Sequence, residues 1–197
     1  VKNSIKRVAK TPWFIIAVIS MVVCLAGVIV AVVILSRSAP LSGAGTEDDP
    51  YLIGSAEELE KFSDYIDAES RSGEHFLLTS DINLGGAEWS PVAANSCFNG
   101  VFDGGGHTVS NFTIASYGSR IGFFANIGGG ESAGVYNLIL NNVAIDTATD
   151  AYAVGVIAAC ADARIENCKV IADVSLGGHT AYVGGITGYA GNTVTGC

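Results

Sequence analysis

Val154-Gly155-Val156-Ile157 and Ile165-Glu166-Asn167-Cys168 decide the fold, because both stretches return 29 positions later. Their second copies are Val183-Gly184-Gly185-Ile186 and Val194-Thr195-Gly196-Cys197. Earlier matches are Ile121-Gly122-Phe123-Phe124 for the first stretch, and Val135-Tyr136-Asn137-Leu138 and Val109-Ser110-Asn111-Phe112 for the second. The second stretch recurs at spacings of 26 to 30 residues, which indicates an architecture in which each repeat contacts its neighbours.

The residues around these repeats have the pattern of short strands. After Gly73, apolar runs alternate with Gly, Asn and Asp, and no helical period recurs. We therefore expect an all-β solenoid whose coils stack about 4.8 Å apart. Asn111, Asn137 and Asn167 should share one corner, where their amides bond the turn and the next coil. Sugar binding is the functional alternative for these three residues.

A long apolar segment precedes the repeats. Residues 11–36 contain no charge and exceed the roughly 20 residues that span a bilayer, so they predict a single transmembrane helix acting as a signal anchor. Four basic residues and no acid lie in residues 1–10, which predicts a cytoplasmic tail and an extracellular remainder. Cleavage near Ser42-Gly43-Ala44 is the alternative, although signal peptides have shorter apolar regions.

The exterior part divides into a linker, 37–50, and a β-helix domain, 51–197. Ser55-Ala56-Glu57-Glu58 has the form of a capping box, and apolar residues follow at helical spacing. We expect one amphipathic helix over residues 56–69 that caps the N-terminal end of the solenoid.

Charge is distributed unevenly along the chain. Residues 38–197 hold five basic and 19 acidic residues, a net charge of −14. Nucleic-acid binding is excluded as a function class, because phosphate backbones need a basic surface. The acidity favours solubility, and a basic partner or bound calcium is the alternative interpretation.

The stretch Phe98-Asn99-Gly100-Val101-Phe102-Asp103-Gly104-Gly105-Gly106-His107, with the Val-Gly-Gly-Ile-Thr-Gly element at 183–188, resembles bacterial surface proteins that carry GLUG-motif repeats. The resemblance extends over most of residues 45–197. It implies a right-handed parallel β-helix on an extracellular protein, often linked to adhesion or to surface peptidases. It supplies no catalytic site. Val156-Ile157-Ala158-Ala159 lacks the second and third glycines of the motif, so this coil should turn differently.

Catalytic β-helices that act on polysaccharides use clustered carboxylates. No cluster is expected here, because Asp162 aligns with Gly191 and Glu166 with Thr195. The other acidic candidates are Asp81, Asp103 and Glu131. Asp103, Gly104 and Gly106 could form either a tight turn or a ligand-binding loop. His107 has no second histidine at the spacing of zinc ligands. We expect no catalytic, cofactor or metal residues.

Cys168 and Cys197 should occupy one ladder position on neighbouring coils as stacked interior thiols, although their Cα atoms come within disulfide range. Cys97 and Cys160 should be buried.

The sequence favours a non-enzymatic, adhesin-like surface module with a glycan or protein ligand. A polysaccharide lyase or hydrolase is the alternative. Because the first residue is Val and no cap follows the last repeat, we expect a fragment whose residues 38–197 self-associate when expressed alone.

Overall fold

The computed structural model describes residues 41–68, 72–114, 118–147 and 150–197. The predicted membrane segment, 11–36, lies outside these ranges. Within them, no helix combines the length and apolar character that a bilayer crossing requires.

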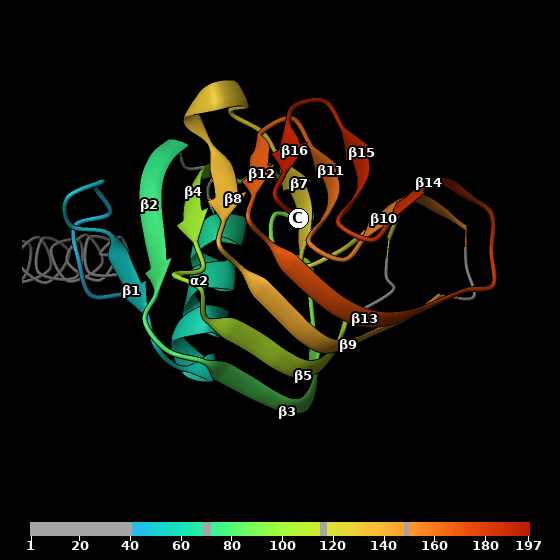
Figure 1. The fold of residues 1–197 in the computed structure, drawn as a ribbon, viewed down its shortest axis with the longest axis horizontal. Helices are drawn as coiled ribbons and strands as arrows, with labels where there is room; N and C mark the ends of the chain where they lie inside the picture. Colours follow the sequence, from blue (N-terminus) through green and yellow to red (C-terminus); the bar gives the residue numbers. More distant parts are fainter. Residues whose placement is uncertain (1–40, 69–71, 115–117, 148–149) are drawn as a thin grey trace, which may run out of the picture. The chain divides into compact units, whose positions relative to one another are not determined.

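Short strands stack in parallel as successive turns of one coil (Figure 1). From β4 onward, each turn visits four sheets in the same order and returns to the first. We name them sheets 1 to 4. Sheet 1 contains β1 (Tyr51–Ile53), β2 (Ser72–Leu78), β4 (Asn99–Asp103), β8 (Gly134–Tyr136), β12 (Arg164–Glu166) and β16 (Val194–Thr195). Sheet 2 contains β3 (Ile82–Trp89), β5 (Thr108–Ile114), β9 (Ile139–Thr147) and β13 (Lys169–Leu176).

The other two sheets complete each turn. Sheet 3 contains β6 (Arg120–Ile121), β10 (Ala151–Gly155) and β14 (Thr180–Gly184), and sheet 4 contains β7 (Phe124–Ile127), β11 (Ala158–Ala161) and β15 (Thr187–Ala190). A short 3-10 helix, η1 (Gly130–Ser132), precedes β8. The predicted parallel stacking of strands is therefore confirmed.

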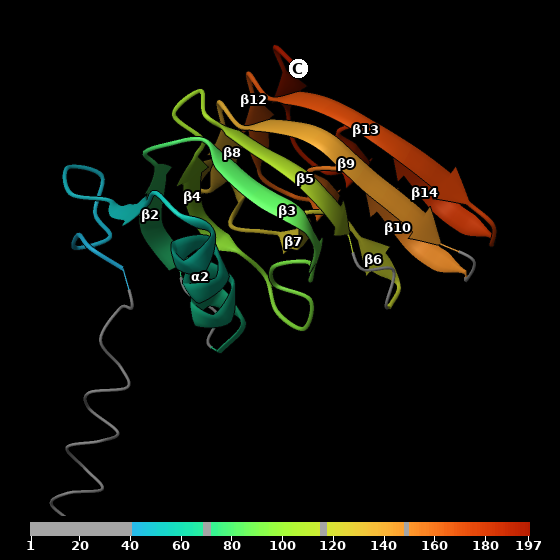
Figure 2. The ribbon, with the colours of Figure 1, turned by 90° about the horizontal axis from the view of Figure 1, so that it is seen from below.

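The first turn is different, because α2 (Ala56–Ala68) connects β1 directly to β2. Ser55 accepts a hydrogen bond from the Glu58 amide at 3.2 Å, and Glu58 Oε2 accepts one from the Gly54 amide at 2.8 Å. The helix predicted for 56–69 thus begins as expected. Figure 2 shows α2 beside the early strands. Phe62 is fully buried there among the rings of four other phenylalanines, Phe76, Phe98, Phe102 and Phe124.

Residues 41–50, in the segment predicted as a linker, contact the first two strands. Leu41 is buried, the Leu52 amide donates to Ser42 O at 2.8 Å, and the His75 amide donates to Gly45 O at 2.9 Å. Gly45 has φ +73°, and a Cβ there would meet the Tyr51 ring at 2.4 Å. The glycines that resembled linker residues therefore permit close packing.

The late repeats have the predicted register. Val154 pairs with both Ile121 and Val183, and Ile165 pairs with both Val135 and Val194. The match of Val109 to Val135 and Ile165 is wrong, since Val109 pairs with Ile82 and Leu140 in sheet 2.

The corner at residues 156–159 also differs from expectation. Val154 pairs with Val183 and Ala158 with Thr187, so this corner and the next have equal length. A Cβ built on Gly185 meets nothing within 4 Å, which explains why Val156 fits at the equivalent place.

Candidate functional site

The glycine-rich turn after β4 fits the stacking of the coils. A Cβ on Gly104 would lie 2.5 Å from both Asn137 O and Leu138 Cα in the next coil. Gly106 has φ +77°, a conformation that favours glycine. Asp103 Oδ1 accepts hydrogen bonds from the Gly105 amide at 2.8 Å and from Asn137 Nδ2 at 2.9 Å. This turn therefore joins two coils, in agreement with the interpretation of these residues as a tight turn.

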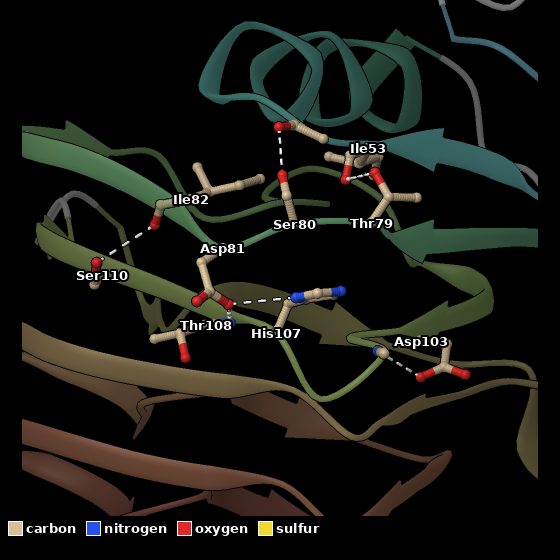
Figure 3. A network of polar contacts seen from close by, with 11 residues as sticks. Ile53, Thr79, Ser80, Asp81, Ile82, Asp103, His107, Thr108 and Ser110 are labelled. Carbon is tan, nitrogen blue, oxygen red and sulfur yellow. Dashed lines mark hydrogen bonds and ion pairs between the residues drawn. The ribbon is translucent and has the colours of Figure 1, made fainter.

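Asp81 joins the preceding pair of coils (Figure 3). Its Oδ1 accepts a hydrogen bond from the Thr108 amide at 2.9 Å and lies 3.3 Å from His107 Nδ1. The Thr108 amide is the main reason that the pKa of Asp81 lies below its usual value, and His107 adds to the effect. Both side chains are solvent-accessible, so the contact orients a turn at the surface.

The three asparagines do not share one corner. Asn137 and Asn167 do, since they follow the paired residues Tyr136 and Glu166 and both have positive φ. Asn111 lies in sheet 2, where it accepts a hydrogen bond from Asn142 Nδ2 at 2.7 Å and donates one to Asn83 Oδ1 at 3.0 Å. The expectation was wrong because Val109 had been aligned with Val135.

The four cysteines in the part of the chain that the structure describes are free thiols. Cys168 is buried and Cys197 exposed, and the Cys168 amide contacts Cys197 Sγ at 3.4 Å, which agrees with neighbouring ladder positions. Burial raises the pKa of Cys168 to about 12. Cys97 is exposed and Cys160 half-buried, contrary to the expectation that both would be buried.

The acidic candidates are dispersed. Glu131 lies 3.4 Å from Arg164, and Asp162 lies beside Gly191 as predicted. Glu166 pairs with Thr195, also as predicted. Among the residues that the structure describes, no three His, Cys, Asp or Glu side chains are placed to hold a metal ion.

Sheet 1 nevertheless contains three polar residues side by side on successive strands, which the sequence repeats did not predict. Asp103, Tyr136 and Glu166 are successive partners on β4, β8 and β12. Burial, followed by the charge of Glu166, raises the pKa of the Tyr136 hydroxyl. Two carboxylates thus lie two coils apart with a phenol between them.

A second unpredicted feature is an exposed aromatic surface on sheets 3 and 4, which we call the tyrosine surface and define as Arg120, Tyr152, Tyr182 and Tyr189. The Arg120 guanidinium lies 5.5 Å from the Tyr152 ring centroid. The centroids of Tyr152 and Tyr182 are 5.3 Å apart, and those of Tyr182 and Tyr189 are 5.5 Å apart. The three tyrosines keep 43%, 40% and 40% of their surface exposed.

Tyr152 and Tyr182 meet diagonally across β10 and β14, which pair without a register shift. On the other side of β10, the amides of Tyr152 and Ala153 both donate to Ser119 O in the preceding coil. Tyr182 pairs with Ala153, yet its ring contacts Tyr152. The repeated Ala-Tyr at 151–152 and 181–182 was the available signal, but alignment on Val-Gly offset the two tyrosines by one position.

No family model matches the chain. It is 33% identical over 144 residues to Halomucin of Haloquadratum walsbyi, which covers 68% of this chain and 2% of that protein. It is 37% identical over 106 residues to a "Putative Gly-rich membrane protein" of Evansella cellulosilytica, which covers 50% of this chain and 12% of that protein. The chain therefore spans a small part of the length of either relative.

A solved structure titled "Crystal structure of a putative immunoglobulin A1 protease from Bacteroides ovatus" is also similar. It has a TM-score of 0.35 and 16% identity, and the match covers 77% of each chain.

Proposed function

We propose that this chain is a membrane-anchored, extracellular β-helical interaction module of adhesin-like type. The observation that carries the proposal is the tyrosine surface. Exposed tyrosines and arginines are the residues that dominate recognition sites, because their large, partly polar side chains gain much on contact with a partner. By contrast, the polar groups of the Asp81 and Asp103 turns are engaged in holding coils together.

The proposed location rests on separate support. Residues 11–36 have the composition of a membrane span, residues 1–10 are basic, and one relative is named as a membrane protein. The GLUG-like motifs and a right-handed coil belong to the same proposal. On intact cells, added protease should remove the region after residue 37 and spare an N-terminal tag. Protection of the acidic domain would refute the orientation.

The function itself is tested by display. Cells or liposomes that carry the full chain should bind a surface ligand, and the triple variant Tyr152→Ser, Tyr182→Ser, Tyr189→Ser should lose that binding while retaining its melting temperature. Binding that survives the triple substitution would remove the observation on which the proposal depends.

A polysaccharide-acting enzyme is the second candidate, and the alignment of Asp103, Tyr136 and Glu166 favours it. Strands two coils apart are separated by roughly 9.6 Å, close to the upper limit of the roughly 6.5–9.5 Å that inverting glycosidases require. Asp103, however, is engaged with Asn137. Release of reducing ends or unsaturated products that disappears in both Asp103→Ala and Glu166→Gln would establish the enzyme and refute the non-enzymatic module.

A further inference from the structure

The tyrosine surface continues into a hollow at its Arg120 end. This hollow has a volume of about 320 Å³ and is lined by Ala94, Asn95, Gly118, Ser119 and Arg120. Arg120 therefore contacts the Tyr152 ring and also lines the hollow. Arg120 thus connects the tyrosine rings to a hollow whose lining also includes the amide side chain of Asn95.

Arg120 carries a positive charge that no carboxylate neutralises among the residues that the structure describes. Arg164 is paired with Glu131 at 3.4 Å, and Lys61 is paired with Glu57 at 2.7 Å. Arg120 contacts an aromatic ring instead. A planar guanidinium held in this way has donors available for a carboxylate, which it binds through two parallel hydrogen bonds.

The rings define what lies next to that carboxylate. Neighbouring rings meet edge to face, with centroids 5.3 and 5.5 Å apart and interplanar angles of 66° and 71°, so each exposed ring offers a separate contact to one sugar ring. A tyrosine offers an apolar ring to the C–H face of a pyranose and a hydroxyl to its oxygen atoms.

We propose that the tyrosine surface binds an acidic polysaccharide of uronate type. Pyranose rings pack against the exposed parts of the Tyr152, Tyr182 and Tyr189 rings, and one uronate carboxylate enters the hollow to pair with Arg120. The inference rests on the proposed function, because only a displayed domain meets such a polymer. Elsewhere the acidic domain repels the polyanion, so binding is confined to this site and weakens as salt screens the Arg120 charge.

The test uses the full chain in detergent micelles and size-defined oligogalacturonate, with the carboxyl-reduced oligomer as the neutral probe. By calorimetry, Arg120→Gln should weaken oligogalacturonate binding about ten-fold and leave binding of the neutral oligomer unchanged. Tyr182→Ala should weaken binding of both oligomers about ten-fold, whereas Tyr182→Phe should retain most of the affinity. Arg164→Gln is the matched control, because it removes an arginine that is already paired with Glu131 on sheet 1 and should have no effect.

Four results would overturn the inference. Equal affinity for the acidic and neutral oligomers would eliminate the role of Arg120. Oligogalacturonate binding that withstands both Arg120→Gln and Tyr182→Ala would place the ligand elsewhere. If displayed cells bind a partner through the tyrosine surface while neither oligomer binds, the polysaccharide assignment fails and the interaction module stands. If the displayed cells bind nothing at all, both fail.

Discussion

Replacement of Phe62 by alanine tests the role of α2 as the cap of the coil. The side chain has no exposed surface and lies 4.8 to 6.2 Å, centroid to centroid, from the rings of Phe76, Phe98, Phe102 and Phe124. Deletion of a buried phenyl ring costs about 3–5 kcal/mol of unfolding free energy, because both its transfer from water and its packing are lost. For a domain of this size, about 2–4 °C per kcal/mol gives a melting temperature lowered by roughly 6–20 °C.

The assay is thermal unfolding of the full chain, followed by circular dichroism and by the fluorescence of Trp89. Trp89 stacks on Phe123 at 4.7 Å and donates to its carbonyl oxygen, so it reports on the coils beyond the helix. Trp13→Phe in every sample makes Trp89 the sole tryptophan. Leu52→Ala is the control, because Leu52 is 38% exposed and should cost less than about 1 kcal/mol. A shift of less than about 2 °C for Phe62→Ala would refute the capping role. So would helix loss that leaves the Trp89 transition unchanged.

Three further predictions follow from single contacts. Gly106→Ala should lower the unfolding free energy by about 1 kcal/mol. Gly104→Ala should lower it by more, because only a Cβ at residue 104 meets the next coil. Equal losses in denaturant titrations would contradict this. The pKa of Asp81 is lowered in the folded state, so its contribution is present above the unfolded pKa of about 3.9 and is lost as pH falls through the folded value. Asp81→Asn should therefore reduce the acid sensitivity of the melting temperature, and an unchanged acid limb would exclude the contact. The raised pKa of Cys168 predicts that the stability of the fold declines as pH rises above about 8.5. Alkylation in the native protein should be slow at Cys168 and rapid at Cys97. Equal alkylation rates, measured by mass spectrometry, would contradict the burial of Cys168.

The repeat register was predictable where the coils have equal length. Val154 and Val183 lie at equivalent corners, and the same chain interval separates Ile165 from Val194, so one shift describes both strands. The capping helix was predictable for a different reason, since its N-terminal hydrogen bonds and apolar face are local. The position of Asn111 was not predictable, because its neighbours resemble those of Asn137 although they belong to another sheet.

The tyrosine surface was missed because alignment on the Val-Gly neighbours offsets Tyr152 and Tyr182 by one position. The structure keeps this offset, since Tyr182 pairs with Ala153, and the two rings meet diagonally across β10 and β14. The packing of residues 41–50 was not predicted, because Gly43 and Gly45 have the composition of a flexible segment but the conformation of a packed one.

Sheet 2 contains a place where coils differ in length without losing register. Between aligned neighbours, β3 has the three residues Leu84, Gly85 and Gly86, whereas β5 and β9 have one residue each, Asn111 and Asn142. The paired segment of β13 has none there. A Cβ on Gly85 or Gly86 meets nothing within 4 Å. The chain can therefore accept foreign peptide between Gly85 and Gly86, such as an epitope tag or a cleavage site, at a position where natural variation in coil length is already tolerated.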